Sequence, residues 1–389
     1  MTTTIDNEHK TFNVPNLRFP EFEGEWEEHG LSEFLDFKNG LNPKPEKFGK
    51  GIKFISVMDI LNNTIITYDS IKACVDANNK EIDNYSVKMG DLLFQRSSET
   101  LEDVGRANVY MDEKPAIFGG FVIRGKKKGE YNPLFFKNLL ETPFSRRKII
   151  PMGAGAQHFN IGQEGLSKVK LYFAPINEQN KIAKILSLLD DRISTQNKII
   201  EDLKKLKSAI SERLFKDAKG DIITLSEICD IVKGEQINGE LLSEHGKYYV
   251  MNGGTDPSGY YDNYNVGAHT ISISEGGNSC GYVQFNKCPF WCGGHCYSIQ
   301  NIADNINNLY LYHYLKTEEK AIMKLRIGSG LPNIQKKDLA TFKIKLPTSK
   351  QQKAISDILS LLEQKAEIEE QILIAMQDEK QYLLRQMFI

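Results

Sequence analysis

The chain repeats itself, and this internal duplication constrains its fold more than any other feature of the sequence. Asn160-Ile161 recurs as Asn333-Ile334, and the string ILSLL at 185–189 recurs at 358–362, in both cases 173 residues later. Further upstream, three more matches keep the same order: Gly40 with Gly234, Pro115 with Pro289, and Gly119-Gly120 with Gly293-Gly294. A series of matches in one order indicates a tandem duplication, so we expect two similar halves.

Each half consists of a mixed segment of short elements followed by a long helix. β-branched and aromatic residues predict strands at 53–57, 121–123, 247–250 and 270–273. Helical spacing of apolar residues predicts helices at 134–140 and 308–315. Pro175 and Pro347 come just before the long helices, where proline is tolerated.

The two long helices carry matching heptad patterns, with a polar layer at the same level in both. About 40 residues correspond to about 60 Å of helix, which favours pairing of the two helices over two independent surface helices. The sequence therefore predicts an α+β fold in which two pseudo-two-fold-related α/β domains are separated by an antiparallel pair of long coiled-coil helices. The expected segments are an N-terminal arm (1–20), a first domain (21–175), a first helix (176–216), a second domain (217–346) and a second helix (347–389).

Charge and composition limit the classes of function. The chain has 49 basic and 51 acidic residues, a net charge of −2, which argues against a protein held on nucleic acid by overall positive charge. Local basic clusters remain, so a reader with basic patches is not excluded. The sequence contains no uninterrupted stretch of about 18 apolar residues, so no transmembrane helix is predicted. A chain of this size does not need disulfide bonds between its cysteines in order to fold, so we expect a cytoplasmic protein.

Two similar domains separated by a spacer of fixed length are suited to bind a long, regular partner that has two recognition sites a set distance apart. Duplex DNA fits this description, since two-fold readers meet half-sites about 34–36 Å apart. Because the two halves diverge in their middles, the half-sites should differ in sequence. The alternative is a helical adapter or scaffold that binds protein partners without reading DNA.

The duplicated junction gives a more specific indication. In both halves a Gly-x-Gly turn, Asn-Ile, a strand, a proline and an ILxLL string follow one another, and VPNLRFPEFEGEW stands at 14–26. In these features, and in its order of domain, helix, domain, helix, the chain resembles the specificity (S) subunit of type I restriction-modification systems over essentially its whole length.

This resemblance implies a subunit without catalytic activity of its own. In the family, S binds double-stranded DNA and two methyltransferase (M) subunits, the M subunits largely through the long helices. Restriction (R) subunits join through M. The complex methylates adenine in a bipartite, asymmetric site and, with R, cleaves DNA in an ATP-dependent reaction. S-adenosylmethionine, ATP and Mg²⁺ are then expected in the partner subunits, and this chain itself is expected to hold no cofactor.

The residues agree with a role without catalysis. An adenine methyltransferase needs Pro-Pro after Asn or Asp, and the nearest string, Asn132-Pro133-Leu134-Phe135, lacks the second proline. Gly120 to Lys126 has the spacing of a phosphate loop, but Lys127 replaces the required Ser or Thr and the segment is predicted as strand.

Candidate DNA contacts are polar or basic residues in loops and glycine turns. Arg and Gln read guanine and adenine edges, and glycine lets a backbone approach phosphate. An ordinary surface loop remains the alternative for each of them. The candidates are Lys44, Lys47, Lys50, Gln95, Arg96, Ser97, Ser98, Gln157, His158, Ser274, Asn278, Ser329, Asn333 and Lys336.

Two further groups of residues complete the predictions. The apolar seam of the helices supplies candidates for partner binding: Ile182, Leu189, Ile193, Ile200, Ile355, Leu362 and Leu373. Cys288, Cys292, His295 and Cys296 are spaced like zinc ligands, but Cys292 takes the place of Phe118 and Cys296 that of Val122, both apolar strand positions. The repeat therefore favours buried core thiols over zinc, and no metal site is predicted.

Overall fold

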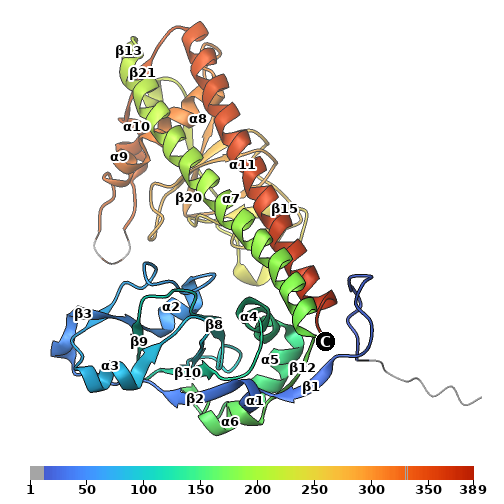
Figure 1. Cartoon of the computed structure of the whole chain (residues 1–389). Coiled ribbons are helices and arrows are strands. Elements are labelled where there is room, and N and C mark those ends of the chain that lie inside the picture. The colour runs from blue at the N-terminus through green and yellow to red at the C-terminus, as the bar shows by residue number, and fades with distance from the viewer. Residues whose placement is uncertain (1–12, 329, 331) are drawn as a thin grey trace, which may run out of the picture. The chain divides into compact units, whose positions relative to one another are not determined.

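The computed structural model describes residues 13–328, 330 and 332–389, and the chain divides into two compact units (Figure 1). Unit 1 comprises Met1–Gln196 and Ile372–Ile389, and unit 2 comprises Asn197–Gln371. Two long helices, α7 (Ile176–Asp217) and α11 (Ser349–Gln386), each contribute one part to both units. Within the described residues, no helix is both long and apolar enough to cross a membrane.

The globular part of unit 1 is built on small sheets flanked by short helices. Its central sheet is antiparallel, with the strand order β2-β10-β6-β8, and a second sheet has the order β4-β3-β9-β5, in which β3 and β9 are parallel. Strand β1 pairs with β12, and β7 with β11. The strands are β1 (Glu27–Gly30), β2 (Leu35–Asn39), β3 (Phe48–Ile55), β4 (Cys74–Val75), β5 (Ser86–Val87), β6 (Leu92–Gln95), β7 (Ser97–Ser98), β8 (Ala107–Val109), β9 (Ala116–Phe118), β10 (Val122–Lys127), β11 (Phe159–Asn160) and β12 (Lys170–Phe173). The short helices are α1 (Leu31–Phe34), α2 (Val57–Asn62), α3 (Asn79–Tyr85), α4 (Pro133–Glu141), α5 (Pro143–Ile149) and α6 (Gln163–Lys168), with 3-10 turns η1 (Pro45–Lys47) and η2 (Ile150–Met152).

Unit 2 repeats this plan with fewer elements. Its central sheet has the order β14-β20-β17-β18, and β15 pairs with β19 in parallel as β3 does with β9. The strands are β13 (Asp221–Thr224), β14 (Asp230–Lys233), β15 (Tyr248–Met251), β16 (Tyr260–Tyr261), β17 (Thr270–Ser274), β18 (Val283–Asn286), β19 (Trp291–Cys292), β20 (Cys296–Gln300) and β21 (Lys343–Leu346). The short helices are α8 (Asn308–Thr317), α9 (Glu319–Met323) and α10 (Lys336–Ala340), with 3-10 turns η3 (Leu225–Glu227) and η4 (Gly239–Leu241).

The matching glycines of the sequence are explained by one close approach of two chain segments. At Gly40 an added side chain would collide with the carbonyl of Gly119, and at Gly234 it would collide with that of Gly293. A residue with a Cβ cannot occupy either place without moving the backbone. The duplication therefore preserves the same crossing of segments in both units.

One expected strand is shorter than the sequence indicates. Residues 53–57 were predicted as strand, but β3 ends at Ile55 and Val57 begins α2. The reason is a capping box: the backbone N–H of Ser56 donates to Asp59 Oδ2 at 2.7 Å, which starts a helix immediately after the strand.

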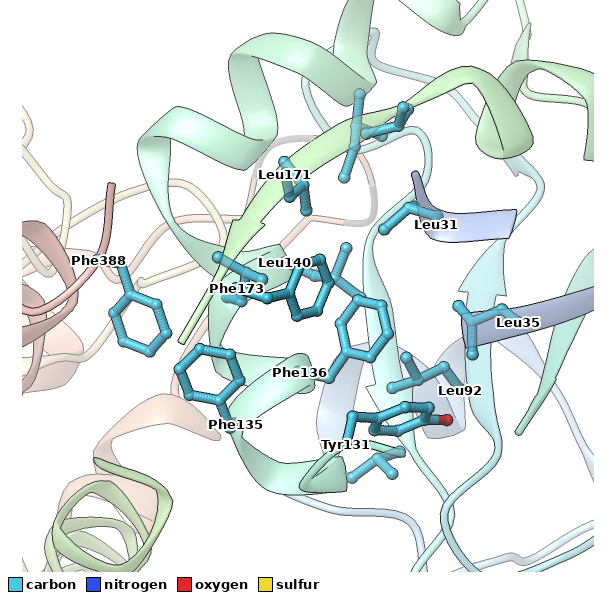
Figure 2. Packing of buried hydrophobic residues seen from close by; sticks show 14 of the residues in the cluster. Leu31, Leu35, Leu92, Tyr131, Phe135, Phe136, Leu140, Leu171, Phe173 and Phe388 are labelled. Atoms are coloured by element: carbon cyan, nitrogen blue, oxygen red, sulfur yellow. The ribbon is translucent and has the colours of Figure 1, made fainter. Parts of the chain in front are cut away.

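The core of unit 1 is rich in aromatic side chains and includes the C-terminal end of the chain (Figure 2). Phe388, which lies just after α11, stacks on Phe135 of α4 with ring centroids 5.2 Å apart, and meets Trp26 edge-on at 6.1 Å. Figure 2 shows Phe388 pointing toward Phe135 from a separate segment of the chain. The last residues of the sequence thus close the core of the first domain.

Unit 2 contains the reciprocal contact. Phe215, near the end of α7, packs on Tyr310 of α8 with ring centroids 5.6 Å apart. The pairing is equivalent to that of Phe388 with Phe135, because the N-cap residues Asn132 and Asn307 align the two helices. Each long helix therefore begins at one domain and ends in the core of the other.

The two long helices lie side by side in each unit (Figure 1). In unit 1, Lys380 of α11 forms an ion pair with Asp190 of α7 at 2.7 Å. In unit 2, Lys204 of α7 pairs with Glu370 at 2.7 Å and Lys207 pairs with Glu363 at 3.0 Å. The start of α7 thus meets the end of α11, which is the predicted antiparallel arrangement.

Candidate nucleic-acid interface

In unit 1, the structure brings together two of the predicted loop segments. Strand β7 (Ser97–Ser98) pairs with β11 (Phe159–Asn160), and the N–H of Ile161 donates to the carbonyl of Arg96 at 2.9 Å. Gln157 and His158 are exposed in the turn just before β11. The strand-end segment and the glycine turn therefore form one continuous polar edge.

The residues of this edge differ in their accessibility. Gln95 is buried and donates from Nε2 to the carbonyl of Ser97, and Ser98 is buried beside the backbone of Thr100. Ser97 is half-buried and its hydroxyl bonds to Asn160. Arg96 is half-buried and donates from Nη1 to the carbonyl of Gly120 at 3.2 Å. Gln95 and Ser98 consequently shape the edge, while Arg96 remains partly open to solvent.

The predicted lysines of the first domain lie around β3. Lys44 is exposed directly before the turn η1. Lys47 lies 3.4 Å from Glu81, and Lys50 lies 3.7 Å from Asp76. The pair of Lys50 with Asp76 is exposed and therefore weak, so Lys50, like Lys44, stays available to a polyanion, whereas the pair of Lys47 with Glu81 is half-buried.

In unit 2, the equivalent edge is formed by the loop after β17 and the turn before α10. Asn333 bridges to Gly276, and the N–H of Ile334 donates to the carbonyl of Glu275 at 2.9 Å, which repeats the bond between Ile161 and Arg96. Asn278, Asn333 and Lys336 are exposed, whereas Ser274 is buried and donates to the carbonyl of Gly253 at 2.6 Å. Ser329, another candidate, lies outside the described residues.

The charge at the centre of this edge differs between the two units. Arg96 in unit 1 corresponds to Glu275 in unit 2, because each donates its backbone N–H to the residue after the paired glycines, Phe121 or His295, at 2.9 Å. Glu275 accepts from Lys233 at 2.7 Å and from the hydroxyl of Tyr297 at 3.0 Å. Burial and this carboxylate raise the pKa of Tyr297, which keeps its hydroxyl protonated as a donor. The first edge is thus basic where the second carries a paired acid.

An apolar bowl of about 560 Å³ lies next to the edge in unit 1. Its walls come from the segment after Gly40, the start of α2 and the loop between β9 and β10. Phe121 is 66% exposed there and Met58 60% exposed, so the apolar surface is open to solvent. The lining residues are Leu41, Asn42, Pro43, Phe48, Phe54, Ser56, Val57, Met58, Ser97, Gly119, Gly120, Phe121 and Val122.

The cysteine cluster is divided between core and surface. Cys292 and Cys296 are buried with Met251, Val266 and Phe290, at the positions that Phe118 and Val122 occupy in unit 1. Cys288 and His295 are exposed. A hydrogen bond with Cys296 and burial raise the pKa of the Cys292 thiol, which disfavours the thiolate that zinc binds. Within the part of the chain that the structure describes, no group of His, Cys, Asp or Glu side chains is placed to hold a metal.

Most of the predicted partner-binding residues on the long helices face inward. Ile182 belongs to the core of unit 1, Ile355 packs with Phe215 in unit 2, and Leu189 and Ile200 are buried as well. Ile193, Leu362 and Leu373 are half-buried. The buried residues of this set therefore pack inside the units and are not accessible to a partner.

A second set of apolar side chains on the same helices faces solvent. Ile185 and Leu188 on α7 are exposed, and so are their repeat equivalents Ile358 and Leu361 on α11. These four residues are not among the predicted partner-binding residues, although the sequence carries a signal for them: the string ILSLL has apolar residues on more sides of the helix than one heptad seam requires. Phe121 was overlooked for a similar reason, since it was predicted as the start of a strand that in fact begins at Val122.

The string Asn132-Pro133 has a structural role. The side chain of Asn132 accepts from the N–H groups of Leu134 and Phe135, both at 3.0 Å, and so caps α4. Asn307 caps α8 in the same way through Tyr310. The repeated asparagine is a helix cap in both units.

Two α/β domains with one framework, different exposed side chains and a shared pair of long helices define a duplicated recognition protein. Residues 23–205 and 219–377 each match the family model described as type I restriction modification DNA specificity domain. The chain belongs to this family and carries two copies of its domain.

Individual relatives agree with this assignment. The chain is 25% identical to the type I restriction enzyme MjaVIII specificity subunit of Methanocaldococcus jannaschii, over 90% of this chain and 88% of that one. Its fold is similar to the crystal structure of the type I restriction-modification S subunit from M. genitalium, with a TM-score of 0.66, 20% identity, and coverage of 97% and 99% of the two chains. A chain from a study of complex assembly in a type I system matches with a TM-score of 0.55 at 16% identity, over 92% of this chain and 96% of that one. The chain is therefore a type I specificity subunit with two target recognition domains, and the adapter alternative is not favoured.

Proposed function

We propose that each domain reads one half of a bipartite, asymmetric DNA site and that the paired helices set the distance between the halves. The observation that carries this proposal is the pair of polar edges, one in each unit, built on the same backbone hydrogen bonds but with different side chains. One framework gives both domains the same way of approaching a duplex, and different side chains give each a different sequence to read.

We further propose that two methyltransferase subunits dock on the long helices, one at Ile185 and Leu188 and one at Ile358 and Leu361. Each pair is exposed, and the two pairs are related by the 173-residue repeat. A solvent-exposed apolar pair on a helix that is already packed on its other side is suited to a protein partner. Equivalent surfaces on the two helices favour two copies of one subunit.

In this proposal the chain is not an enzyme and binds no cofactor. S-adenosylmethionine would belong to the methyltransferase subunits, and ATP and Mg²⁺ to restriction subunits that join through them. The complex would methylate adenine and cleave unmethylated DNA. All six cysteines, every one within the described residues, are free thiols, which agrees with action in a reducing cytoplasm.

The test is reconstitution of the full chain with the methyltransferase subunit of its system, followed by sequencing of the methylated DNA. We expect adenine methylation in a bipartite site with two different half-sites. Methylation at a single continuous site, or at no defined site, would contradict the proposal.

Stoichiometry tests the docking surfaces separately. Leu188→Glu or Leu361→Glu should each leave one methyltransferase subunit per chain, and the double variant none, as measured by light scattering of the purified complex. Ile222→Glu is a matched control, because Ile222 is 68% exposed but lies on β13, outside both helices. Two bound subunits in the double variant would refute this docking surface.

A further inference from the structure

The two units share a framework around the apolar bowl down to individual hydrogen bonds. The N–H of Leu41 donates to the carbonyl of Phe118 at 2.9 Å, and the N–H of Glu235 donates to that of Cys292 at 2.9 Å. These bonds, like the two that surround Arg96 and Glu275, make positions 41 and 235 equivalent, and likewise 121 and 295.

Within this framework, buried and exposed positions behave differently. The buried positions stay apolar in both units: Phe118 corresponds to Cys292, and Val122 to Cys296. The less buried positions change character. The half-buried Leu41, which packs against the cluster of Phe54, Val75 and Ile117, is replaced by the exposed Glu235, and the exposed Phe121 by the exposed His295. Leu41 packs partly on the core of unit 1, but Phe121 is exposed and its equivalent in unit 2 is polar. The fold therefore does not require an apolar residue at position 121, and the exposed Phe121 needs another explanation.

The surroundings of the bowl indicate a nucleic-acid occupant. Lys44 is exposed and directly follows the lining residue Pro43. Arg96 holds the carbonyl of the lining residue Gly120 at 3.2 Å, and Ser97 belongs to both the bowl and the polar edge. A basic rim complements phosphates on either side of a base, so the bowl faces the same partner as the edge.

Among the base edges in the major groove, the 5-methyl group of thymine is the apolar one, and Phe is among the side chains that contact it. We propose that the bowl is a base-reading site in which Phe121 and Leu41 pack against the methyl group of a thymine in the half-site read by the first domain. The equivalent positions in the second domain, Glu235 and His295, read their base through hydrogen bonds. This inference rests on the proposed DNA-reading function and names the residues that determine part of its specificity.

The test replaces each thymine of the methylated site in turn by uracil, which lacks the methyl group. Binding is measured on the full chain in complex with its methyltransferase subunit. Burial of one methyl-sized group contributes about 0.8 kcal/mol, so the wild-type complex should bind about four-fold more weakly when one particular thymine is replaced. Phe121→Ala should bind the unmodified site more weakly by a similar factor and no longer respond to uracil at that position.

Met89→Ala is the matched control, because Met89 is 55% exposed in the turn before β6, at the opposite end of that strand from Arg96. It should keep the full response to uracil. The inference is overturned if the wild-type complex tolerates uracil at every position, or if Phe121→Ala keeps the wild-type response. It is also overturned if Phe121→Ala binds DNA normally but loses a protein subunit.

These outcomes are separable from failure of the proposed function. A complex that selects no bipartite site overturns both proposals. A complex that selects such a site but is indifferent to uracil overturns only the assignment of the bowl. Circular dichroism of Phe121→Ala confirms that the compared proteins are folded, and Phe121→Leu, which retains an apolar side chain, should keep part of the response.

Discussion

Truncation of Phe388 should destabilise the first domain, although this residue is the penultimate one of the chain. Its side chain is 5% exposed and stacks on Phe135 in the core of unit 1. Replacing a buried Phe by Ala costs about 3–5 kcal/mol, from lost transfer free energy and the cavity that remains. Because about 1.4 kcal/mol corresponds to a factor of ten, Phe388→Ala should raise the local opening constant of unit 1 by at least about 100-fold.

Hydrogen exchange measured by mass spectrometry locates this effect. In Phe388→Ala, exchange should accelerate in peptides that cover α4 and leave those of α8 unchanged. Phe215→Ala is the reciprocal variant, since Phe215 packs on Tyr310, and it should accelerate exchange in α8. If Phe388→Ala instead loosened α8, the reciprocal closure of the two domains would be refuted.

Two further predictions concern buried charge and pH. Arg18 donates two hydrogen bonds, of 2.8 and 2.7 Å, to the fully buried carboxylate of Glu178. Because Arg18→Ala leaves this buried charge unpaired, it should lower the free energy of unfolding, measured with denaturant, by about 3 kcal/mol. A decrease of less than about 1 kcal/mol would contradict the burial of the carboxylate. Burial lowers the pKa of His313 from 6.5 to about 4, against the opposing effect of Glu363. Between these values the unfolded state binds more protons, so the stability of unit 2 should fall by up to about 3 kcal/mol as pH drops from 6.5 to 4. His313→Gln should remove that slope, and an unchanged slope in the variant would exclude His313 as its origin.

The sequence was sufficient to predict the architecture because each informative pattern occurs twice. A pattern found in the first half is supported by its copy in the second half. Gly40 and Gly234 each permit a close approach of two backbone segments that a side chain would prevent, so this requirement is visible in both copies of the repeat. The heptad pattern is informative in the same way. An apolar seam that continues for about 40 residues is typical of a long helix paired with another helix, and it occurs in both halves.

The site was less predictable because exposure depends on tertiary packing. Ile182 and Ile185 are both apolar residues of α7 and only three positions apart, but packing buries the first and exposes the second. Gln95 and Ser274 are the last residues of β6 and β17, where polar residues often bind ligands, yet both are buried and their side chains donate to backbone carbonyls. Phe121 was assigned to a strand, and only the loop between β9 and β10 turns it outward.

The pairing of the two long helices determines how the spacer can be lengthened. Lys204 pairs with Glu370 across the two helices, so an insertion in one helix alone would break the register of the other. Seven residues must be added to both, by repeating 198–204 after Lys204 and 363–369 after Glu369. Each of the two long helices then becomes about 10 Å longer.

The spacer length of the methylated site in this double-insertion variant is the most direct measurement of the central claim. If the helices set the distance between the two domains on DNA, the gap between the half-sites should grow by about two or three base pairs, at about 3.4 Å per pair, with both half-sites unchanged. A methylome in which the variant is active and the gap keeps its original length would show that the helices do not measure the site.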